Sequence, residues 1–331
     1  MAPKNYLPLI ISLGILFSIN MLMISSLSPG LLGKQLLSWG IGIGLFFAGT
    51  QVNPRQIASS KIFVFVISCL LLLTPIALNN ITRGSRRWIE LGFMSIQPSE
   101  FVKPWLMLFL VNTSFPLLIL IPFFITLMQP DLGSGLTILL LTAPLVLYNK
   151  KFFKQILILL AIGTILSPLV WTTMLHGYQK DRISHFLSPQ SDPLGKGYNV
   201  IQSKIAIGSG GIWGKGYRKG TQGQLLFLPE KHTDFMFAST AEELGLIGIS
   251  IIIGSYFLLI KTLINRAYSF QTHPQLKIFI LGITFQIWFT AFINIGMNLG
   301  ILPVTGIPLP FLSVGGSSLM ALMFSLGIIY S

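Results

Sequence analysis

Residues 198–243 read YNVIQSKIAIGSGGIWGKGYRKGTQGQLLFLPEKHTDFMFASTAEE, a glycine-rich and basic segment between two strongly apolar blocks. The segment holds four of the nine acidic residues of the chain, namely Glu230, Asp234, Glu242 and Glu243. Ionisable groups next to hydrocarbon are costly and usually have a functional reason to be there. We therefore predict that this segment carries the chemistry of the chain, with Asp234 as its central group.

The composition places the chain among polytopic membrane proteins. Of its residues, 52% are apolar and only 9% are charged, and the mean hydropathy is +0.76, whereas soluble domains have about 25% charged residues. The formal net charge of +13 does not indicate a nucleic-acid partner, because the basic residues are spread between apolar runs and form no dense patch. An anionic lipid or a phosphorylated substrate fits better. A single cysteine, Cys69, excludes disulfides and cysteine metal clusters.

Continuous apolar runs predict about ten transmembrane helices, because a bilayer core of about 30 Å needs about 20 helical residues. The runs also lack the alternation of apolar and polar residues that is typical of a barrel strand. The first run has no cleavage site, so we read it as an uncleaved span. The runs are 6–27, 35–52, 62–78, 101–111, 115–128, 132–148, 156–175, 244–260, 278–295 and 311–330.

Residues 101–128 form either two short spans with a tight turn or one long tilted helix. The charge distribution favours two, because ten spans with a cytoplasmic N-terminus give the basic bias that the positive-inside rule requires. The inner side then holds Lys4, Arg55, Lys61, Lys150, Lys151, Lys154, Lys261, Arg266 and Lys277, and the short outer loops hold Lys34, Arg83, Arg86 and Arg87. We expect one polytopic domain, 1–331, with residues 176–241 as a large extracytoplasmic loop.

The basic residues of this loop have two interpretations. The first is a solvated loop that touches anionic headgroups, and the second is a groove that holds a diphosphate at the outer membrane face. Residues 200–211 predict a short amphipathic helix in the interface. The run GSGGIWGKG is not a phosphate-binding loop, because its glycine spacing is wrong and Gly216 follows Lys215 where Ser or Thr is needed. Flexible turns account for most of its glycines.

Asp234 lies at the edge of hydrocarbon, just before Phe235, Met236 and Phe237. Such a site tends to raise the basicity of a carboxylate, which suits a general base near neutral pH. Capping of the following helix is the alternative for Asp234 and Glu242. His232 lies two residues away without a third ligand nearby, so a metal site is the weaker hypothesis.

Three more polar groups lie in or near the predicted spans. Trp88 and neighbouring arginines form an outer belt that either anchors the chain or contacts lipid-linked phosphate. Glu100 and Lys103 share one helix face, so we expect them to pair and to line a polar cavity. Asp131 is placed to cap the sixth helix. The Pro- and Gly-rich connection 294–318 must be buried in protein or line a cavity.

Several motifs resemble the SEDS family of bacterial cell-wall polymerases, and its RodA branch more than its FtsW branch. They are YQKDRI, DPLGKGYNVIQSKIAIGSGGIWGKG, GTQGQLLFLPEKHTDFMFA, AEELGLIG and LPVTGIPLPFLSVGGSS, and the likeness runs from Trp88 to Leu326. Two departures are the short 112–116 connection and Val314, where the family often has tyrosine.

The resemblance implies a ten-span peptidoglycan glycosyltransferase of cell elongation, which polymerises lipid II on the outer face of the bacterial cytoplasmic membrane. It implies Asp234 as the essential loop aspartate, Glu100 and Lys103 as the paired acid and base, and Trp88 as the outer tryptophan. Undecaprenyl diphosphate would leave with help from cations, for which the candidates are Lys204, Lys215, Arg218, Lys231 and Arg83.

The implied partners are a class B penicillin-binding transpeptidase and other membrane proteins of the elongation machinery, with no nucleic acid. These motifs make no cofactor certain, and assistance by a divalent cation, Mg²⁺ or Mn²⁺, stays open. Two alternatives belong to other classes: a lipid II flippase, and a scaffold that activates a transpeptidase. The acids cluster toward one face, whereas a flippase should need charged groups through the whole membrane depth, so we favour the enzyme.

Overall fold

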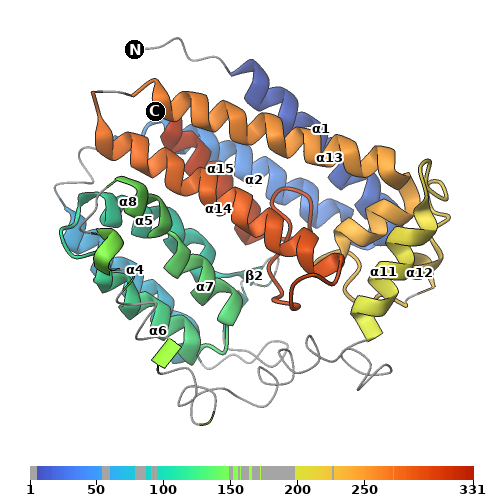
Figure 1. Cartoon of the computed structure of the whole chain (residues 1–331), viewed down its shortest axis with the longest axis horizontal. Helices are drawn as coiled ribbons and strands as arrows, with labels where there is room; N and C mark the ends of the chain where they lie inside the picture. Colours follow the sequence, from blue (N-terminus) through green and yellow to red (C-terminus); the bar gives the residue numbers. More distant parts are fainter. Residues whose placement is uncertain are drawn as a thin grey trace.

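Apolar helices are the main elements of the part of the chain that the computed structural model describes (Figure 1). The structure describes residues 6–53, 60–78, 87–90, 92, 95–148, 198–225, 227–270 and 272–331, with isolated positions between 152 and 172. The elements are α1 (Leu7–Leu27), η1 (Pro29–Leu31), α2 (Leu32–Thr50), α4 (Lys61–Leu78), β1 (Ile89–Glu90), β2 (Ser95–Ile96), α5 (Pro98–Asn112), η2 (Pro116–Ile119), α6 (Leu120–Met128), α7 (Leu132–Leu140), α8 (Ala143–Tyr148), α11 (Tyr198–Gly210), α12 (Thr221–Gln224), α13 (Met236–Tyr268), α14 (Pro274–Asn298) and α15 (Gly316–Ile329).

Within the described residues, five helical segments are long and apolar enough to cross a membrane: Leu7–Leu27, Pro29–Thr50, Lys61–Leu78, Met236–Tyr268 and Pro274–Asn298. Three shorter apolar helical segments accompany them, at Pro116–Met128, Leu132–Val146 and Gly316–Ile329. Together with α5 (Pro98–Asn112), these segments give each predicted run except the seventh a helical counterpart. Most of the seventh run, 156–175, lies outside the described residues, as does Arg83.

The region 101–128 forms two helices, as predicted from charge. α5 ends at Asn112, and a non-helical break leads into η2 at Pro116. Two other boundaries differ from the apolar runs. α13 begins at Met236, inside the predicted loop, because buried polar residues continue its helix beyond the apolar run. α15 begins at Gly316, after an irregular connection.

Close backbone contact joins α2 to α15. A Cβ atom on Gly49 would overlap the Phe324 carbonyl oxygen, and one on Gly327 would overlap the Phe46 carbonyl oxygen. Small residues at such positions let membrane helices approach until their backbones touch. This pair forms one side of the core, which continues into α1, α5, α13 and α14.

The connection 299–315 is irregular backbone inside the bundle, and most of residues 307–313 are buried. Side chains from three helices satisfy its carbonyl groups. Asn20 donates to the Leu312 carbonyl, Tyr256 to that of Pro310, and Asn294 to that of Ile307. Since unpaired backbone groups are costly in a membrane, these bonds explain how the segment is held, and they agree with its predicted burial in protein.

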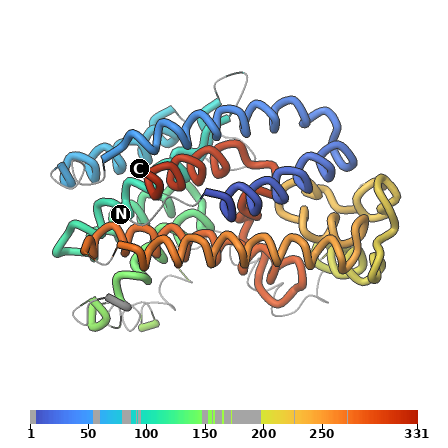
Figure 2. The backbone as a smooth tube through the Cα atoms, turned by 90° about the horizontal axis from the view of Figure 1, so that it is seen from above, coloured from blue at the N-terminus to red at the C-terminus, as the bar shows by residue number. Residues whose placement is uncertain are grey.

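The predicted amphipathic helix is present as α11, packed against α13 and α14. α11 and α12 lie at one end of the bundle, next to the start of α13 (Figure 1). Figure 2 shows this segment, in yellow, at the end of the molecule opposite the C-terminus. The last turn of α13 and the first turn of α14 lie at the other end, the one that holds the C-terminus, so the two helices connect the ends of the bundle.

Candidate functional site

Asp234 lies two residues before Met236, where α13 begins, and is half-buried. Its backbone carbonyl accepts hydrogen bonds from two amide side chains of α14, Asn298 at 2.9 Å and Asn294 at 3.2 Å. The next residue, Phe235, is fixed in a small core with Ala206, Leu228 and Ala238. The aspartate is therefore held by its own backbone and by its neighbour, so its position is defined by three helices.

The connection 299–315 docks onto the segment that carries Asp234. The Ser313 hydroxyl donates to the Thr233 carbonyl at 2.5 Å, and the Val314 amide donates to the His232 carbonyl at 2.9 Å. A Cβ atom added to Gly306 would lie 3.7 Å from Asp234 Oδ2, so the carboxylate faces the Gly306 backbone. Gly306 has a φ of +71°, a conformation that glycine adopts without strain.

A second polar group surrounds Asp131, at the start of α7. Its carboxylate caps the helix by accepting from the Ser134 amide at 3.1 Å, as predicted. It also accepts from the Gln97 side chain at 2.9 Å and lies 3.2 Å from the Arg87 guanidinium. Asp131 is 3% exposed, so these partners compensate a buried charge.

Trp88 stands beside this group. Arg87 lies over its ring at 6.0 Å from the centroid. The two residues lead into the hairpin of β1 and β2, which pairs Ile89 with Ile96 and Glu90 with Ser95. Sequence patterns did not predict this hairpin, because each strand has only two residues.

Residues 305–307 run between the two polar groups. A Cβ atom on Gly133 would lie 3.0 Å from the Thr305 carbonyl oxygen and 3.7 Å from Asp131 Oδ1. The backbone of Gly306, the residue after Thr305, faces Asp234. The structure thus brings the predicted residues Asp234 and Asp131 to the same connection, although they are far apart in the sequence.

Glu100 and Lys103 pair as predicted, with Lys103 Nζ 2.5 Å from Glu100 Oε1. Both are buried, at 7% and 2% exposed. They lie on the first turns of α5, directly after Gln97, which contacts Asp131. The pair therefore belongs to the same end of the bundle as the aspartates, while its role in lining a cavity stays a prediction.

The candidate cations differ in what they already bind. Lys215 pairs with Glu242 at 2.7 Å, Arg218 donates to the Ser25 carbonyl at 2.9 Å, and Lys231 donates to the Gly223 carbonyl at 2.7 Å. Burial lowers the pKa of Lys231, and Glu243 partly opposes this. Lys204 is exposed on α11, and its side chain lies over Gly300 at the start of the connection. Of these four, Lys204 is the one placed beside the segment that faces Asp234.

Glu242 has a structural role that the sequence did not predict. It does not cap its own helix. Instead, its buried carboxylate accepts from the backbone amides of Thr221 and Gln222, at 2.8 and 3.0 Å, and so caps α12. Glu243 accepts from the Ser26 hydroxyl at 2.7 Å and from the Gln224 side chain at 3.0 Å. These contacts come from residues distant in the chain, so no local pattern reveals them.

Asn294 and Asn298 are the site residues that the sequence analysis missed. Two amides four residues apart on an apolar helix share one face, and this was the available signal. His232 is half-buried beside Asp234. Among the described residues, no group of three His, Cys, Asp or Glu side chains could hold a metal ion. The question of Mg²⁺ or Mn²⁺ therefore stays open.

Comparison with known families gives one match over nearly the whole chain. Residues 4–331 match the model FTSW_RODA_SPOVE, described as cell cycle protein. Among curated relatives, the peptidoglycan glycosyltransferase MrdB of Escherichia coli K12 is 38% identical over 316 residues, covering 91% of this chain and 85% of the relative.

Solved structures agree on the fold. One is a chain from a structure described as the structural coordination of polymerization and crosslinking by a peptidoglycan synthase complex. It has a TM-score of 0.82 at 30% identity and covers 100% of this chain and 97% of its own. The rod shape determining protein RodA of Thermus thermophilus has a TM-score of 0.69 at 24% identity, with 99% and 96% covered.

Proposed function

This chain belongs to the FtsW, RodA and SpoVE family, and from that premise we propose that it joins lipid II units into glycan strands with Asp234 as the general base. It is a multi-pass membrane protein and a peptidoglycan glycosyltransferase of the elongation type. The proposal concerns its catalytic residues, its substrate and the membrane face on which it works.

The observation that carries the proposal is the fixed position of Asp234. Two α14 amides bind its carbonyl, a packed phenylalanine follows it, and its carboxylate faces the backbone of Gly306. A half-buried carboxylate held in this way is preorganised, and a preorganised base needs no rearrangement during the reaction. The neighbouring connection 299–315 gives the sugar a polar backbone to bind.

The reaction follows from these residue types. The 4-hydroxyl of the acceptor GlcNAc attacks the anomeric carbon of the donor MurNAc. The new carbon–oxygen bond forms as the bond to undecaprenyl diphosphate breaks on the opposite face, so the configuration inverts. Asp234 takes the hydroxyl proton, and the electron pair leaves with the diphosphate. A diphosphate leaves without being protonated, so no second carboxylic acid is needed, in contrast to glycoside hydrolysis by paired carboxylates.

Lys204 is the first candidate to hold the leaving diphosphate, because it is exposed and lies over Gly300. Lys215, Arg218 and Lys231 are weaker candidates, since each already binds a partner of the chain. Asp131, Glu100 and Lys103 would support the site through the α5 and α7 termini. Trp88 and His232 would border it.

The proposed setting is the outer face of the bacterial cytoplasmic membrane. Lipid tails would remain between helices while the sugars reach Asp234, which keeps donor and acceptor at high effective concentration. A class B penicillin-binding transpeptidase is the proposed partner, since a similar chain occurs in a peptidoglycan synthase complex that couples polymerization with crosslinking.

The direct test is Asp234→Asn, with the purified full chain and labelled lipid II as sole substrate. We expect normal membrane insertion and thermal stability, but at least a hundredfold slower glycan formation, the usual contribution of a general base. Glu230→Gln is the matched control, because Glu230 lies in the same loop and accepts from the Thr233 hydroxyl at 2.8 Å. It should polymerise at the wild-type rate. Wild-type rates for Asp234→Asn would remove the base assignment.

The same assay separates the alternatives. Polymer from lipid II alone supports the enzyme. Movement of lipid II across vesicles without polymer would support a flippase. If lipid II is neither polymerised nor moved, and an added transpeptidase is activated, the result would support a scaffold.

A further inference from the structure

A pocket of about 790 Å³ lies at the end of the bundle opposite Asp234. It is formed where α2 and α5 end, where α13 ends and α14 begins, and beside Ser331, which follows α15. Asp234 precedes α13, whereas Arg266 lies in its last turn. After the kink at Gly245, the unbroken part of α13 up to Arg266 alone spans roughly 30 Å at 1.5 Å per residue, so the pocket cannot belong to the proposed polymerase site.

The pocket has a polar side and an apolar side. Amide side chains of Gln51, Asn53, Asn112 and Gln275 line it together with His273. Phe270, Leu276 and Phe279 are among the residues of the apolar side. No aspartate or glutamate is among the described residues that line it. Its volume lies within the range of about 300–1,000 Å³ typical of small-molecule sites.

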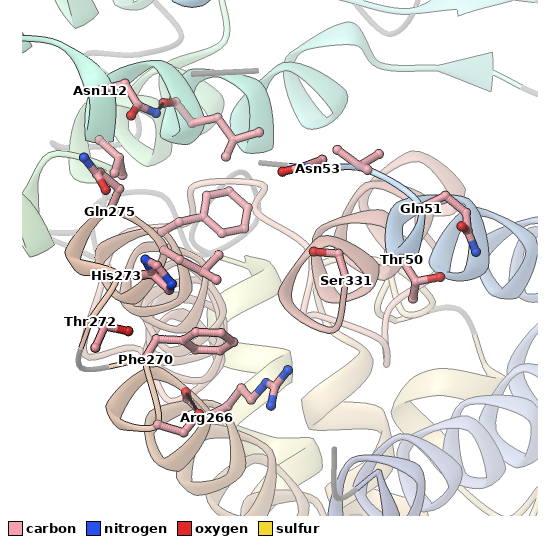
Figure 3. A pocket seen from close by; sticks show the side chains of 16 residues that line it. Thr50, Gln51, Asn53, Asn112, Arg266, Phe270, Thr272, His273, Gln275 and Ser331 are labelled. Carbon is pink, nitrogen blue, oxygen red and sulfur yellow. Dashed lines mark hydrogen bonds between the residues drawn. The ribbon is translucent and has the colours of Figure 1, made fainter. Parts of the chain in front are cut away.

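Arg266 gives the pocket its charge. Figure 3 shows its side chain extending from α13, past the Phe270 ring, toward Ser331. It is 8% exposed, and among the described residues its Nε finds no hydrogen-bond partner and its guanidinium no carboxylate. A buried cation in this state is costly unless an anion pairs with it.

Stacking on aromatic rings does not remove this need. The guanidinium carbon lies 4.7 Å from the centroid of Phe270 and 5.2 Å from that of Tyr330. Such contacts use the faces of the guanidinium, whereas its N–H donors lie in the plane and point outward at its edge. A second cation is close, because Lys61 donates to the carbonyl of the lining residue Asn112 at 3.0 Å.

We propose that this pocket binds a phosphate-bearing anion with an apolar portion, held by the in-plane donors of Arg266. The planar fork of arginine matches phosphate oxygens in a two-point contact. The amides add neutral donors, and the wall of Phe270, Leu276 and Phe279 accepts the apolar part. An anionic phospholipid and a soluble organic phosphate share this chemistry, and the orientation proposed above places the pocket at the cytoplasmic face.

The test measures lipid binding to the full chain by native mass spectrometry from detergent micelles. The probes are dioleoylphosphatidylglycerol, dioleoylphosphatidylcholine, and glycerol 3-phosphate as a soluble competitor. We expect at least a tenfold preference for phosphatidylglycerol over phosphatidylcholine. Arg266→Gln should reduce that preference to less than twofold. Lys261→Gln, an exposed cation of α13 outside the pocket, should leave it unchanged.

A second variant protects the test against misfolding of Arg266→Gln. Thr272 lines the pocket and is exposed, so Thr272→Glu adds a negative charge without disturbing the core. It should weaken binding about tenfold, while Thr272→Gln should not. Binding of phosphatidylglycerol that glycerol 3-phosphate cannot displace identifies a lipid site. Displacement by millimolar glycerol 3-phosphate identifies a site for soluble phosphates. The proposal is overturned if neither probe binds selectively, or if Arg266→Gln and Thr272→Glu both bind like the wild type.

Discussion

Asn298 links the proposed base to the helix that follows it. Its side chain donates to the Asp234 carbonyl at 2.9 Å and accepts from the Ala238 amide at 3.1 Å. Ala238 lies in the first turn of α13, where backbone amides have no partner within the helix. A side chain of α14 therefore caps α13 from outside, and the same side chain fixes the residue that carries the carboxylate.

Replacing the side-chain amide of Asn298 should lower both the stability of the protein and its turnover. Asn298→Leu keeps the size but leaves the Ala238 amide buried without a partner, which costs about 1–3 kcal/mol. We expect a lower unfolding midpoint and kcat reduced roughly ten- to a hundredfold with KM unchanged, because a displaced base slows the chemical step. Thr284→Val, which removes only an intrahelical bond to Ile280, is the control. A stability loss with unchanged kcat would assign Asn298 a purely structural role.

Local sequence reasoning reached some of these residues and not others. Asp234 could be singled out as a candidate because a carboxylate before three large apolar residues is unusual in itself, while its role stays a prediction. The Glu100 and Lys103 pair and the Asp131 cap could be predicted because each depends on spacing within one helix. Glu242 and Asn298 could not, because their partners are distant in the sequence and only the folded chain brings them together.

The helical hydrogen bonds of α13 are interrupted near its start, and the preceding loop supplies hydrogen bonds in their place. Gly245 has φ +66° and ψ −164°, which interrupts the helical hydrogen bonds. The loop after α11 replaces them: the amides of Lys215 and Gly216 donate to the carbonyls of Glu242 and Glu243, and Leu246 donates to Gly211. The glycines expected to form flexible turns instead allow close contact between two defined backbones.

A side chain at the break should therefore be poorly tolerated. A Cβ atom on Gly245 would overlap the backbone of Gly214 and Ile212, in a conformation that other residues rarely adopt. We expect Gly245→Ala to cost roughly 2–5 kcal/mol from strain and overlap. Gly254→Ala, on the same helix with no atom within 4 Å of the added carbon, should be neutral or stabilising by about 0.5–1 kcal/mol. Thermal unfolding of the purified variants measures both, and equal midpoints would contradict a rigid junction.

Periodicity and apolar length predicted most helices of the bundle, because hydrophobic burial in lipid depends mainly on the length of a run. They could not show that α13 extends to 33 residues. Only the part after the kink at Gly245, about 35 Å long, matches a hydrocarbon core of about 30 Å. The polar first turns of α13 are covered by α11, α12 and the intervening loop, which is protein packing that a hydropathy window does not register.

The bundle as a whole has two polar ends joined by α13 and α14, one with Asp234 and one with Arg266. The proposed orientation requires these ends to lie on opposite sides of the membrane, and single cysteines can test this. In a Cys69→Ser background we expect Lys219→Cys to react with an impermeant maleimide only from outside intact spheroplasts, and Thr272→Cys only in inverted vesicles. Both positions are exposed in the structure, so failure to react cannot be explained by burial. The Cys69→Ser chain alone controls for background. Labelling of both cysteines from one side would contradict the placement of the two ends on opposite sides of the membrane. Labelling of Lys219→Cys only in inverted vesicles would contradict an outward-facing Asp234, because a site facing the cytosol could not extend a wall outside the cell.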